Sequence, residues 1–189
     1  MTREPGLDEK IVLVHRAFEA AAIDHAFGGA LALAYYAEPR ATVDVDLNVF
    51  AAPRRAGRSL DTLVALGVAL DRRDTLALVR RDGQVRVRWG RTPLDLFFAY
   101  DPFHTACQVA RRMVPFGDAQ LPILAPEHLV VCKTVFDRRK DWIDIEQVLF
   151  TTAAELDVAE LWTWIDRLIG RDDRRATRLE GLVSAIVGG

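Results

Sequence analysis

The eight residues Val43-Asp44-Val45-Asp46-Leu47-Asn48-Val49-Phe50 carry the clearest structural pattern in the chain, because apolar and polar residues alternate without a break. This alternation predicts a β-strand over 43–50 with its apolar side chains on a core. Asp44 and Asp46 then point the same way, about 7 Å apart at the backbone. Two such carboxylates are able to share the divalent ions that hold the attacking and leaving oxygens in phosphoryl transfer. A strand with one solvated polar face is the alternative.

A pair of glycines lies upstream of this strand, between a short strand predicted at 25–27 and a helix predicted over 30–36. Glycines let backbone N–H groups approach a phosphate closely, and a helix N-terminus favours its negative charge. A Gly-Gly pair alone indicates only a turn. Gly28 and Gly29 together with the two-aspartate strand form a coherent site for a triphosphate.

Asp95 is a third carboxylate, and it lies in the apolar segment Leu94-Asp95-Leu96-Phe97-Phe98 of a strand predicted over 93–99. A charge in such a segment is costly unless it is paired or binds a metal. If this strand lies beside strand 43–50, Asp95 completes a three-carboxylate cluster. Asp95 would then act as a metal ligand or as the base that takes the proton of an acceptor hydroxyl. A side chain that faces solvent at a sheet edge is the alternative.

The remaining patterns predict an α+β fold, with a mixed sheet flanked by helices and a helical C-terminal part. Asp82-Gly83 indicates a hairpin between two strands, and Ser59 or Asp61 is a candidate cap for a helix that ends near Leu70. The predicted strands not yet named span 76–80, 84–89, 113–116 and 121–123, and the predicted helices span 7–23, 127–136, 141–150, 158–168 and 174–186. We therefore expect an α/β core over 1–125 and a helical module, packed on the core, over 126–189.

The second informative stretch runs from Lys133 to Asp144. Its charged residues recur every three or four positions, so they line one side of a helix or of two helices with a tight break. Lys133 follows the apolar residues 129–132 and is one of only three lysines in the chain. We interpret it as a cation that neutralises a triphosphate or the leaving pyrophosphate. Asp141 and Asp144 either hold this lysine or cap the next helix, and ordinary solvated salt bridges are the alternative.

Three segments together resemble the AbiEii-like nucleotidyltransferases: Gly28-Gly29, Arg40-x-Thr42-x-Asp44-x-Asp46, and Lys133 with Arg-Arg-Lys-Asp-x-x-Asp at 138–144. This family includes the mycobacterial MenT-type toxins of toxin–antitoxin systems and belongs to the DNA polymerase beta-like superfamily. The resemblance covers roughly residues 25–150. It implies a nucleotidyltransferase fold, Mg²⁺, a nucleoside triphosphate donor and transfer of a nucleotide to the 3′ end of tRNA, with a cognate antitoxin as a partner.

The resemblance also implies roles for individual residues. Asp44 and Asp46 bind the metal, Lys133 contacts the triphosphate, and Asp141 or Asp144 completes the site. The candidate catalytic residues are Asp44, Asp46, Asp95 and Lys133, and the candidate metal ligands are Asp44, Asp46 and Asp95. The candidate nucleotide-binding residues are Gly28, Gly29, Thr42, Lys133, Lys140, Asp141 and Asp144.

A candidate acceptor surface consists of arginines, which are suited to grip RNA phosphates. Gln84, Arg86 and Arg88 share one face of a predicted strand, and a solvated arginine face is the alternative reading of them. Further arginines flank this strand or follow strand 43–50, namely Arg80, Arg81, Arg91, Arg54, Arg55 and Arg58. The formal net charge of −2 excludes a bulk polycation that binds nucleic acid by charge alone.

The composition predicts a soluble cytoplasmic protein without a membrane partner. No apolar run reaches the roughly 18 residues of a membrane span, and Cys107 and Cys132 form no metal or redox motif. Two alternatives to an RNA-modifying toxin remain open. One is a nucleotidyltransferase that acts on a small molecule or a protein, and the other is a catalytically inactive binding module of the same fold.

Overall fold

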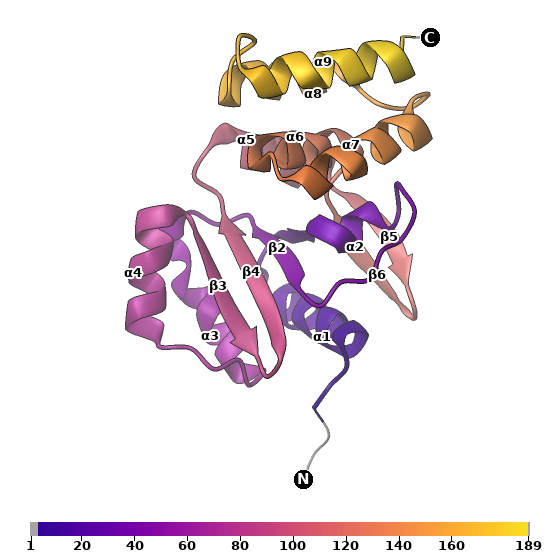
Figure 1. Cartoon of the computed structure of the whole chain (residues 1–189). Coiled ribbons are helices and arrows are strands. Elements are labelled where there is room, and N and C mark those ends of the chain that lie inside the picture. Colours follow the sequence, from indigo (N-terminus) through magenta and orange to yellow (C-terminus); the bar gives the residue numbers. More distant parts are fainter. Residues whose placement is uncertain (1–3, 189) are drawn as a thin grey trace. The chain divides into compact units, whose positions relative to one another are not determined.

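A six-stranded mixed sheet with the strand order β3-β4-β2-β1-β6-β5 forms the centre of the α/β part (Figure 1). The computed structural model describes residues 4–188, so residues 1–3 and 189 of the predicted domains lie outside it. Every predicted strand except 76–80 is confirmed, with small shifts at the ends. The strands are β1 His25–Phe27, β2 Val45–Val49, β3 Gln84–Trp89, β4 Thr92–Phe98, β5 Arg112–Phe116 and β6 Ala119–Ile123.

The register around β2 determines which residues meet. β2 runs antiparallel to β1, where Phe27 pairs with Leu47, and parallel to β4, where Asp46 pairs with Asp95. β3 and β4 form an antiparallel hairpin in which Arg86 pairs with Asp95. Residues in register on neighbouring strands point to the same face of a sheet. Arg86, Asp95 and Asp46 therefore form one row across three adjacent strands.

The strand predicted over 43–50 is shorter in the structure. It begins at Val45, whereas Val43 is 74% exposed and Asp44 precedes the first strand residue. The physical reason is local, because the Thr42 hydroxyl interacts with the backbone N–H and the carboxylate of Asp44. Such a turn around a threonine competes with strand pairing.

The strand predicted at 76–80 and the hairpin at Asp82-Gly83 are wrong. This segment belongs to helix α4, Arg72–Asp82, whose first turn is capped by the Asp71 carboxylate, which accepts from the Asp74 N–H at 2.8 Å. Gly83 ends the helix in the left-handed conformation, with φ of +69°. A glycine after a helix and a glycine in a hairpin turn share this backbone conformation, and so the sequence signal is ambiguous.

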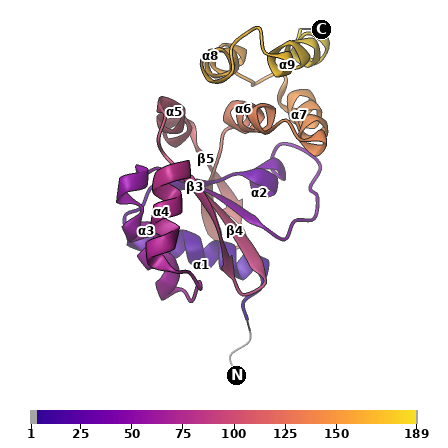
Figure 2. The same ribbon diagram turned by 60° about the vertical axis from the view of Figure 1, so that its left-hand side comes forward.

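Among the helices of the α/β part, α1 contacts β6 and α4 contacts β3. α1 contacts α3, and α3 contacts α4, on one side of the sheet (Figure 2). Ala56 occupies the N-cap position of α3, so the candidate caps Ser59 and Asp61 lie inside the helix instead. α5 was not predicted, although Asp101 caps it and Pro102 occupies its first turn. The elements are α1 Leu7–Ala20, α2 Gly29–Leu33, the 3₁₀ turn η1 Pro53–Arg55, α3 Gly57–Ala65 and α5 Pro102–Ala110.

The chain divides into two compact units, one of residues 4–31 with 41–124 and one of residues 32–40 with 125–188. In the second unit α6 contacts α7, α8 and α9. All four predicted C-terminal helices are confirmed, as α6 Pro126–Phe136, α7 Arg139–Thr152, α8 Val158–Leu168 and α9 Arg174–Ile186. The segment 32–40 belongs to this unit, although it precedes residue 125. The functional division into two domains stays a prediction.

Within residues 4–188, no helix combines the length and the apolar character needed to cross a bilayer. Cys107 is buried and Cys132 is half-buried, and neither forms a disulfide in this part of the chain.

Candidate functional site

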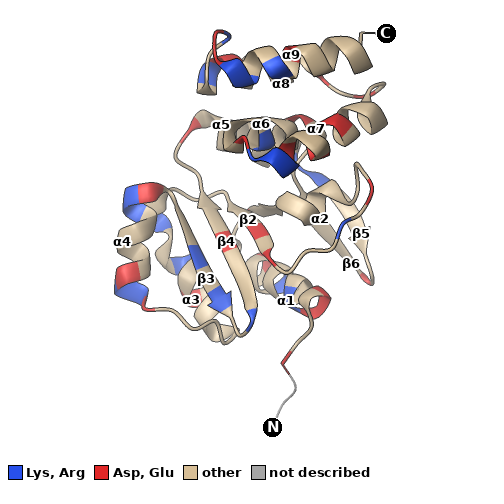
Figure 3. Cartoon of the chain, in the orientation of Figure 1, with Lys and Arg blue, Asp and Glu red and all other residues tan. Residues whose placement is uncertain are grey.

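Asp44, Asp46 and Asp95, which we call the carboxylate row, lie in the first unit on or next to strands β2 and β4 (Figure 3). Asp46 and Asp95 occupy paired positions on neighbouring parallel strands, whose backbones are about 4.8 Å apart. Both side chains are half-buried on the polar face of the sheet. β4 therefore lies directly beside β2, which is the strand pairing that a three-carboxylate cluster requires, and the role of Asp95 in such a cluster stays a prediction.

Arg86 completes the row on the far side of Asp95. Its Nε and Nη2 atoms donate to the two carboxylate oxygens of Asp95 at 2.6 and 2.5 Å. The hydrogen bonds and the charge of Asp95 raise the pKa of the Arg86 guanidinium, and the charges of Asp44 and Asp46 raise it further. The arginine that the sequence suggested as part of an RNA surface is therefore held against the acidic residues.

The glycine turn lies against Asp46. The Gly28 N–H donates to the Asp46 carbonyl oxygen at 2.9 Å. Gly29 has φ of +51°, and a Cβ atom built on it would overlap with Oδ2 of Asp46. Only glycine leaves room for this carboxylate. α2 has only five residues. We therefore attribute the candidate phosphate-binding role of this turn to the close approach of its backbone rather than to a helix dipole.

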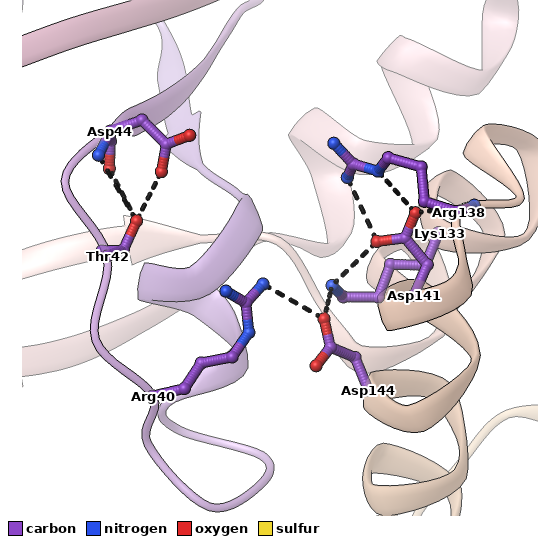
Figure 4. A network of polar contacts seen from close by, with 7 residues as sticks. All are labelled: Arg40, Thr42, Asp44, Lys133, Arg138, Asp141 and Asp144. Carbon is purple, nitrogen blue, oxygen red and sulfur yellow. Dashed lines mark hydrogen bonds and ion pairs between the residues drawn. The ribbon is translucent and has the colours of Figure 1, made fainter.

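Thr42 fixes the Asp44 side chain. Its hydroxyl donates to Oδ1 of Asp44, and the Asp44 N–H donates back to Oγ1 of Thr42 at 3.4 Å (Figure 4). The candidate nucleotide-binding residue Thr42 is therefore, in this structure, a residue that orients a member of the carboxylate row.

The donor set of the row fits a hard cation, since carboxylate oxygens are the ligands that Mg²⁺ prefers. Three carboxylates and one guanidinium give the row and Arg86 a formal net charge of −2. Within the part of the chain that the structure describes, no group of three or more acidic, histidine or cysteine side chains is arranged to hold a metal ion. Mg²⁺ commonly takes only one or two protein carboxylates, with substrate phosphates and water as its other ligands. Asp44 and Asp46 are the candidates for these one or two carboxylates, and their role as metal ligands stays a prediction.

Lys133 lies in the second unit, where it forms a buried network of ion pairs (Figure 4). Its Nζ atom is 2.6 Å from Oδ2 of Asp144 and 3.8 Å from Oδ1 of Asp141. All three residues are at most 4% exposed. Arg40 contacts Asp144 at 3.2 Å, and the Nε atom of Arg138 contacts Asp141 at 2.7 Å. We call these five residues the lysine cluster.

Asp141 and Asp144 hold Lys133, as one of the two expectations had it. Asp141 also meets the other expectation, because it caps α7 by accepting from the Arg138 N–H at 3.1 Å. No sequence pattern assigned partners to Arg40 and Arg138. Arg40 belongs to the motif Arg40-x-Thr42-x-Asp44-x-Asp46. Nothing in this spacing indicates that its partner is Asp144, 104 positions away. Arg138 and Asp141 are three residues apart, and this spacing at a helix start was the available signal. Lys140, the remaining candidate nucleotide-binding residue, is exposed in the first turn of α7.

No protein-family model matches the chain, and no curated protein matches it by sequence. Among solved structures, the chain is similar to an antigenic nucleotidyltransferase-like protein from Paracoccidioides brasiliensis, with a TM-score of 0.53 and 17% identity over 97% of both chains. It is also similar to ANT(2″)-Ia in complex with adenylyl-2″-tobramycin, with a TM-score of 0.62 and 15% identity over 85% of this chain and 97% of that chain. A solution structure of the antibiotic-resistance factor ANT(2″)-Ia gives a TM-score of 0.57 and 15% identity over 91% and 95%.

These likenesses establish the fold. The chain has an α+β nucleotidyltransferase fold, as the sequence predicted. The narrower resemblance to the AbiEii-like toxins stays a prediction.

Proposed function

We propose that this protein is a Mg²⁺-dependent nucleotidyltransferase that transfers a nucleoside monophosphate from a nucleoside triphosphate to an acceptor hydroxyl. One observation carries the proposal. The register of β2 and β4 brings Asp46 beside Asp95, and the Gly28–Gly29 turn lies against the same Asp46. The combination of the carboxylate row and the glycine turn suits a metal-bound triphosphate.

Asp44 and Asp46 would hold the metal, with Thr42 fixing the orientation of Asp44. A bound Mg²⁺ would neutralise the phosphate oxygens and align the acceptor with the leaving group. Gly28 and Gly29 have no side chain that would keep a phosphate away from this turn. The Gly28 N–H already donates to the Asp46 carbonyl oxygen, so the turn contributes close approach of its backbone.

The reaction forms a bond between the acceptor oxygen and the α-phosphorus. The bond from that phosphorus to the bridging oxygen breaks, and pyrophosphate leaves with the electron pair. The hydroxyl proton goes to a carboxylate or to water. Asp95 is the candidate acceptor of this proton, or else the third metal ligand. In this structure both of its oxygens accept from Arg86.

We propose the 3′ end of an RNA, such as tRNA, as the acceptor. The motif resemblance supports this choice, and so does the exposed face of β3, where Gln84, Arg86 and Arg88 lie beside the carboxylate row. Arginines on such a face are suited to bind RNA phosphates. A role as a cytoplasmic toxin with a cognate antitoxin extends the same proposal.

A small-molecule acceptor is the second candidate function. One observation favours it, namely the likeness to ANT(2″)-Ia, whose solved complex holds an adenylylated tobramycin. The polar face of the sheet serves either acceptor, because the chemistry at the α-phosphorus is the same.

For the lysine cluster we propose a supporting role. Lys133 is buried and its ammonium group is engaged by Asp144 and Asp141. It would stabilise the junction of α6 and α7, with Lys140 on the surface as the cation available to a phosphate. The contact between Lys133 and the triphosphate that the resemblance implies is the alternative. The stability and the nucleotide affinity of Lys133→Ala separate the two roles.

The test is label transfer from each of the four α-³²P-labelled nucleoside triphosphates with Mg²⁺. The acceptors are total tRNA in one set and a panel of aminoglycosides in the other. Wild type is compared with Asp46→Asn and with a matched control, Asp118→Asn, whose carboxylate is 82% exposed and pairs with Arg16 at the surface. We expect Asp46→Asn to lose at least about 100-fold in rate and Asp118→Asn to keep wild-type activity.

The acceptor that carries the label decides between the two functions. Label on tRNA supports the RNA proposal, and label on aminoglycosides alone supports the second candidate. Without label on either acceptor, and without metal-dependent binding of any nucleoside triphosphate, the chain would be an inactive binding module and the proposal would be wrong.

A further inference from the structure

Arg86 is a cation on the sheet itself that pairs with a member of the carboxylate row. It lies on edge strand β3, directly opposite Asp95 on β4. The guanidinium binds Asp95 through two parallel hydrogen bonds, so that both carboxylate oxygens are engaged. Arg86 is 58% exposed along its side chain, whereas Asp95 is 15% exposed. The cation therefore approaches the row from the solvent side.

The guanidinium of Arg86 compensates negative charge in the carboxylate row. Asp46 and Asp95 are like charges at paired positions on neighbouring strands, and such a pair is destabilising unless a cation lies near it. In the structure that cation is a guanidinium. A divalent metal bound to the row would meet the same need, and it would compete for the same carboxylate oxygens of Asp95.

We propose that Arg86 is an internal counter-cation that competes with the divalent metal for Asp95 and thereby sets the metal affinity of the carboxylate row. This inference rests on the proposed function, because it presumes that Asp44 and Asp46 bind a metal. Arg86 is a positioning residue that acts through Asp95. While Arg86 holds Asp95, the metal has Asp44 and Asp46 as protein ligands, and Asp95 becomes available only when the guanidinium leaves.

Arginine is suited to this role. Its planar fork matches a carboxylate through two donors and also matches a phosphate, so it is able to exchange one anion for the other. Its exposed position on the edge strand leaves space for that movement on the solvent side. A lysine at this position would keep the charge but lose the two-point attachment to Asp95.

The test measures cation binding rather than catalysis. Mn²⁺ is titrated into the full chain, and the free ion is followed by electron paramagnetic resonance for wild type, Arg86→Gln, Arg86→Lys, Asp46→Asn and Arg72→Gln. Arg72→Gln is the matched control, because Arg72 binds Asp61 through the same two atoms, Nε and Nη2, at 2.6 and 3.0 Å, between helices α3 and α4. Circular dichroism confirms that each variant is folded.

We expect Arg86→Gln to bind Mn²⁺ about tenfold more tightly than wild type, since a unit positive charge next to the row is gone. Arg86→Lys should stay within about threefold of wild type, because the competing charge remains. Arg72→Gln should match wild type, and Asp46→Asn should bind weakly.

The outcomes separate the two proposals. If Mn²⁺ binds and Asp46→Asn abolishes binding, but Arg86→Gln binds no more tightly than wild type, the counter-cation role is overturned while the metal site stands. Equal tightening in Arg72→Gln also overturns it, because the effect would then reflect net charge. If neither wild type nor Arg86→Gln binds Mn²⁺, the metal site and this inference both fail.

Discussion

Oδ2 of Asp46 occupies the place where a Cβ atom at Gly29 would stand. The carboxylate therefore fills the space that any larger residue at position 29 would need. The backbone of Gly29 is also in the left-handed region, with φ of +51°. The glycine turn and the Asp46 carboxylate therefore fit together, and the position of Asp46 depends on the absence of a side chain at Gly29.

Gly29→Ala should displace the Asp46 carboxylate. We expect Mn²⁺ affinity and nucleotidyl transfer to fall by at least about tenfold, and the free energy of unfolding to fall by about 1–2 kcal/mol because of the positive φ. Titration of Mn²⁺, label transfer and urea denaturation measure the three quantities.

Gly117→Ala is the matched control for this substitution. Gly117 has φ of +59°, but nothing lies within 4 Å of the point that its Cβ atom would occupy. This variant should lose a similar amount of stability and keep the affinity for Mn²⁺. Equal metal affinity in both glycine variants would contradict the fit between Gly29 and Asp46.

Lys133→Ala should act mainly on stability. It leaves two buried carboxylates, those of Asp141 and Asp144, without their shared ammonium group. We expect the free energy of unfolding to fall by about 3 kcal/mol, measured by urea denaturation. Lys140→Ala is the control, because it removes an exposed lysine seven residues further on. It should change the free energy of unfolding by no more than about 0.5 kcal/mol. If Lys133→Ala is as stable as wild type but binds nucleoside triphosphate more weakly, the lysine contacts the triphosphate instead.

Most of the sheet could be predicted because its strands alternate in sequence as they do in space. On β3 the side chains of Val85, Val87 and Trp89 are buried, while the residues between them are exposed. The four C-terminal helices were equally clear, since their apolar spacing persists over more than two turns. Local patterns of this kind do not need knowledge of neighbours.

Which side chains meet across the sheet could not be predicted from the sequence. Asp95 lies beside Asp46 because β4 is the parallel neighbour of β2. Arg86 binds Asp95 because of the register of the β3–β4 hairpin. Alternation fixes the face on which a side chain lies, but not its partner. The same limit applies to Gly83, where the sequence could not separate a helix end from a hairpin turn.

Thr42→Val should loosen Asp44, because valine keeps the branched shape of threonine and removes the hydroxyl that donates to Oδ1 of Asp44. We expect Mn²⁺ affinity to fall by about three- to tenfold, because Asp44 keeps its charge and loses only the hydroxyl that fixes its orientation. Thr42→Ser keeps the hydroxyl and should restore most of the affinity. If Thr42→Ser weakens binding as much as Thr42→Val, keeping the hydroxyl does not preserve the affinity, and its hydrogen bond to Asp44 does not account for the effect.

His25 should make folding sensitive to acid. Burial lowers the pKa of His25 from 6.5 to about 4, although the hydrogen bond to the Ile23 carbonyl oxygen opposes the shift. Above pH 6.5 the ring is neutral in both the folded and the unfolded chain, so its contribution is fully present. As the pH falls toward 4, the unfolded chain takes up a proton that the folded chain refuses, and this lowers the free energy of unfolding by about 3 kcal/mol.

Urea denaturation at about pH 7 and about pH 4.5 tests this, with His25→Gln as the variant that cannot titrate. A glutamine side chain is still able to hydrogen-bond to His15, whose ring nitrogen lies 3.0 Å from that of His25. Wild type should lose about 2–3 kcal/mol more than His25→Gln between the two pH values. His104 and His128, whose pKa values burial also lowers, are present in both proteins, so their contributions cancel in the comparison. Equal losses in the two proteins would mean that the His25 ring takes up its proton as readily in the folded chain as in the unfolded one.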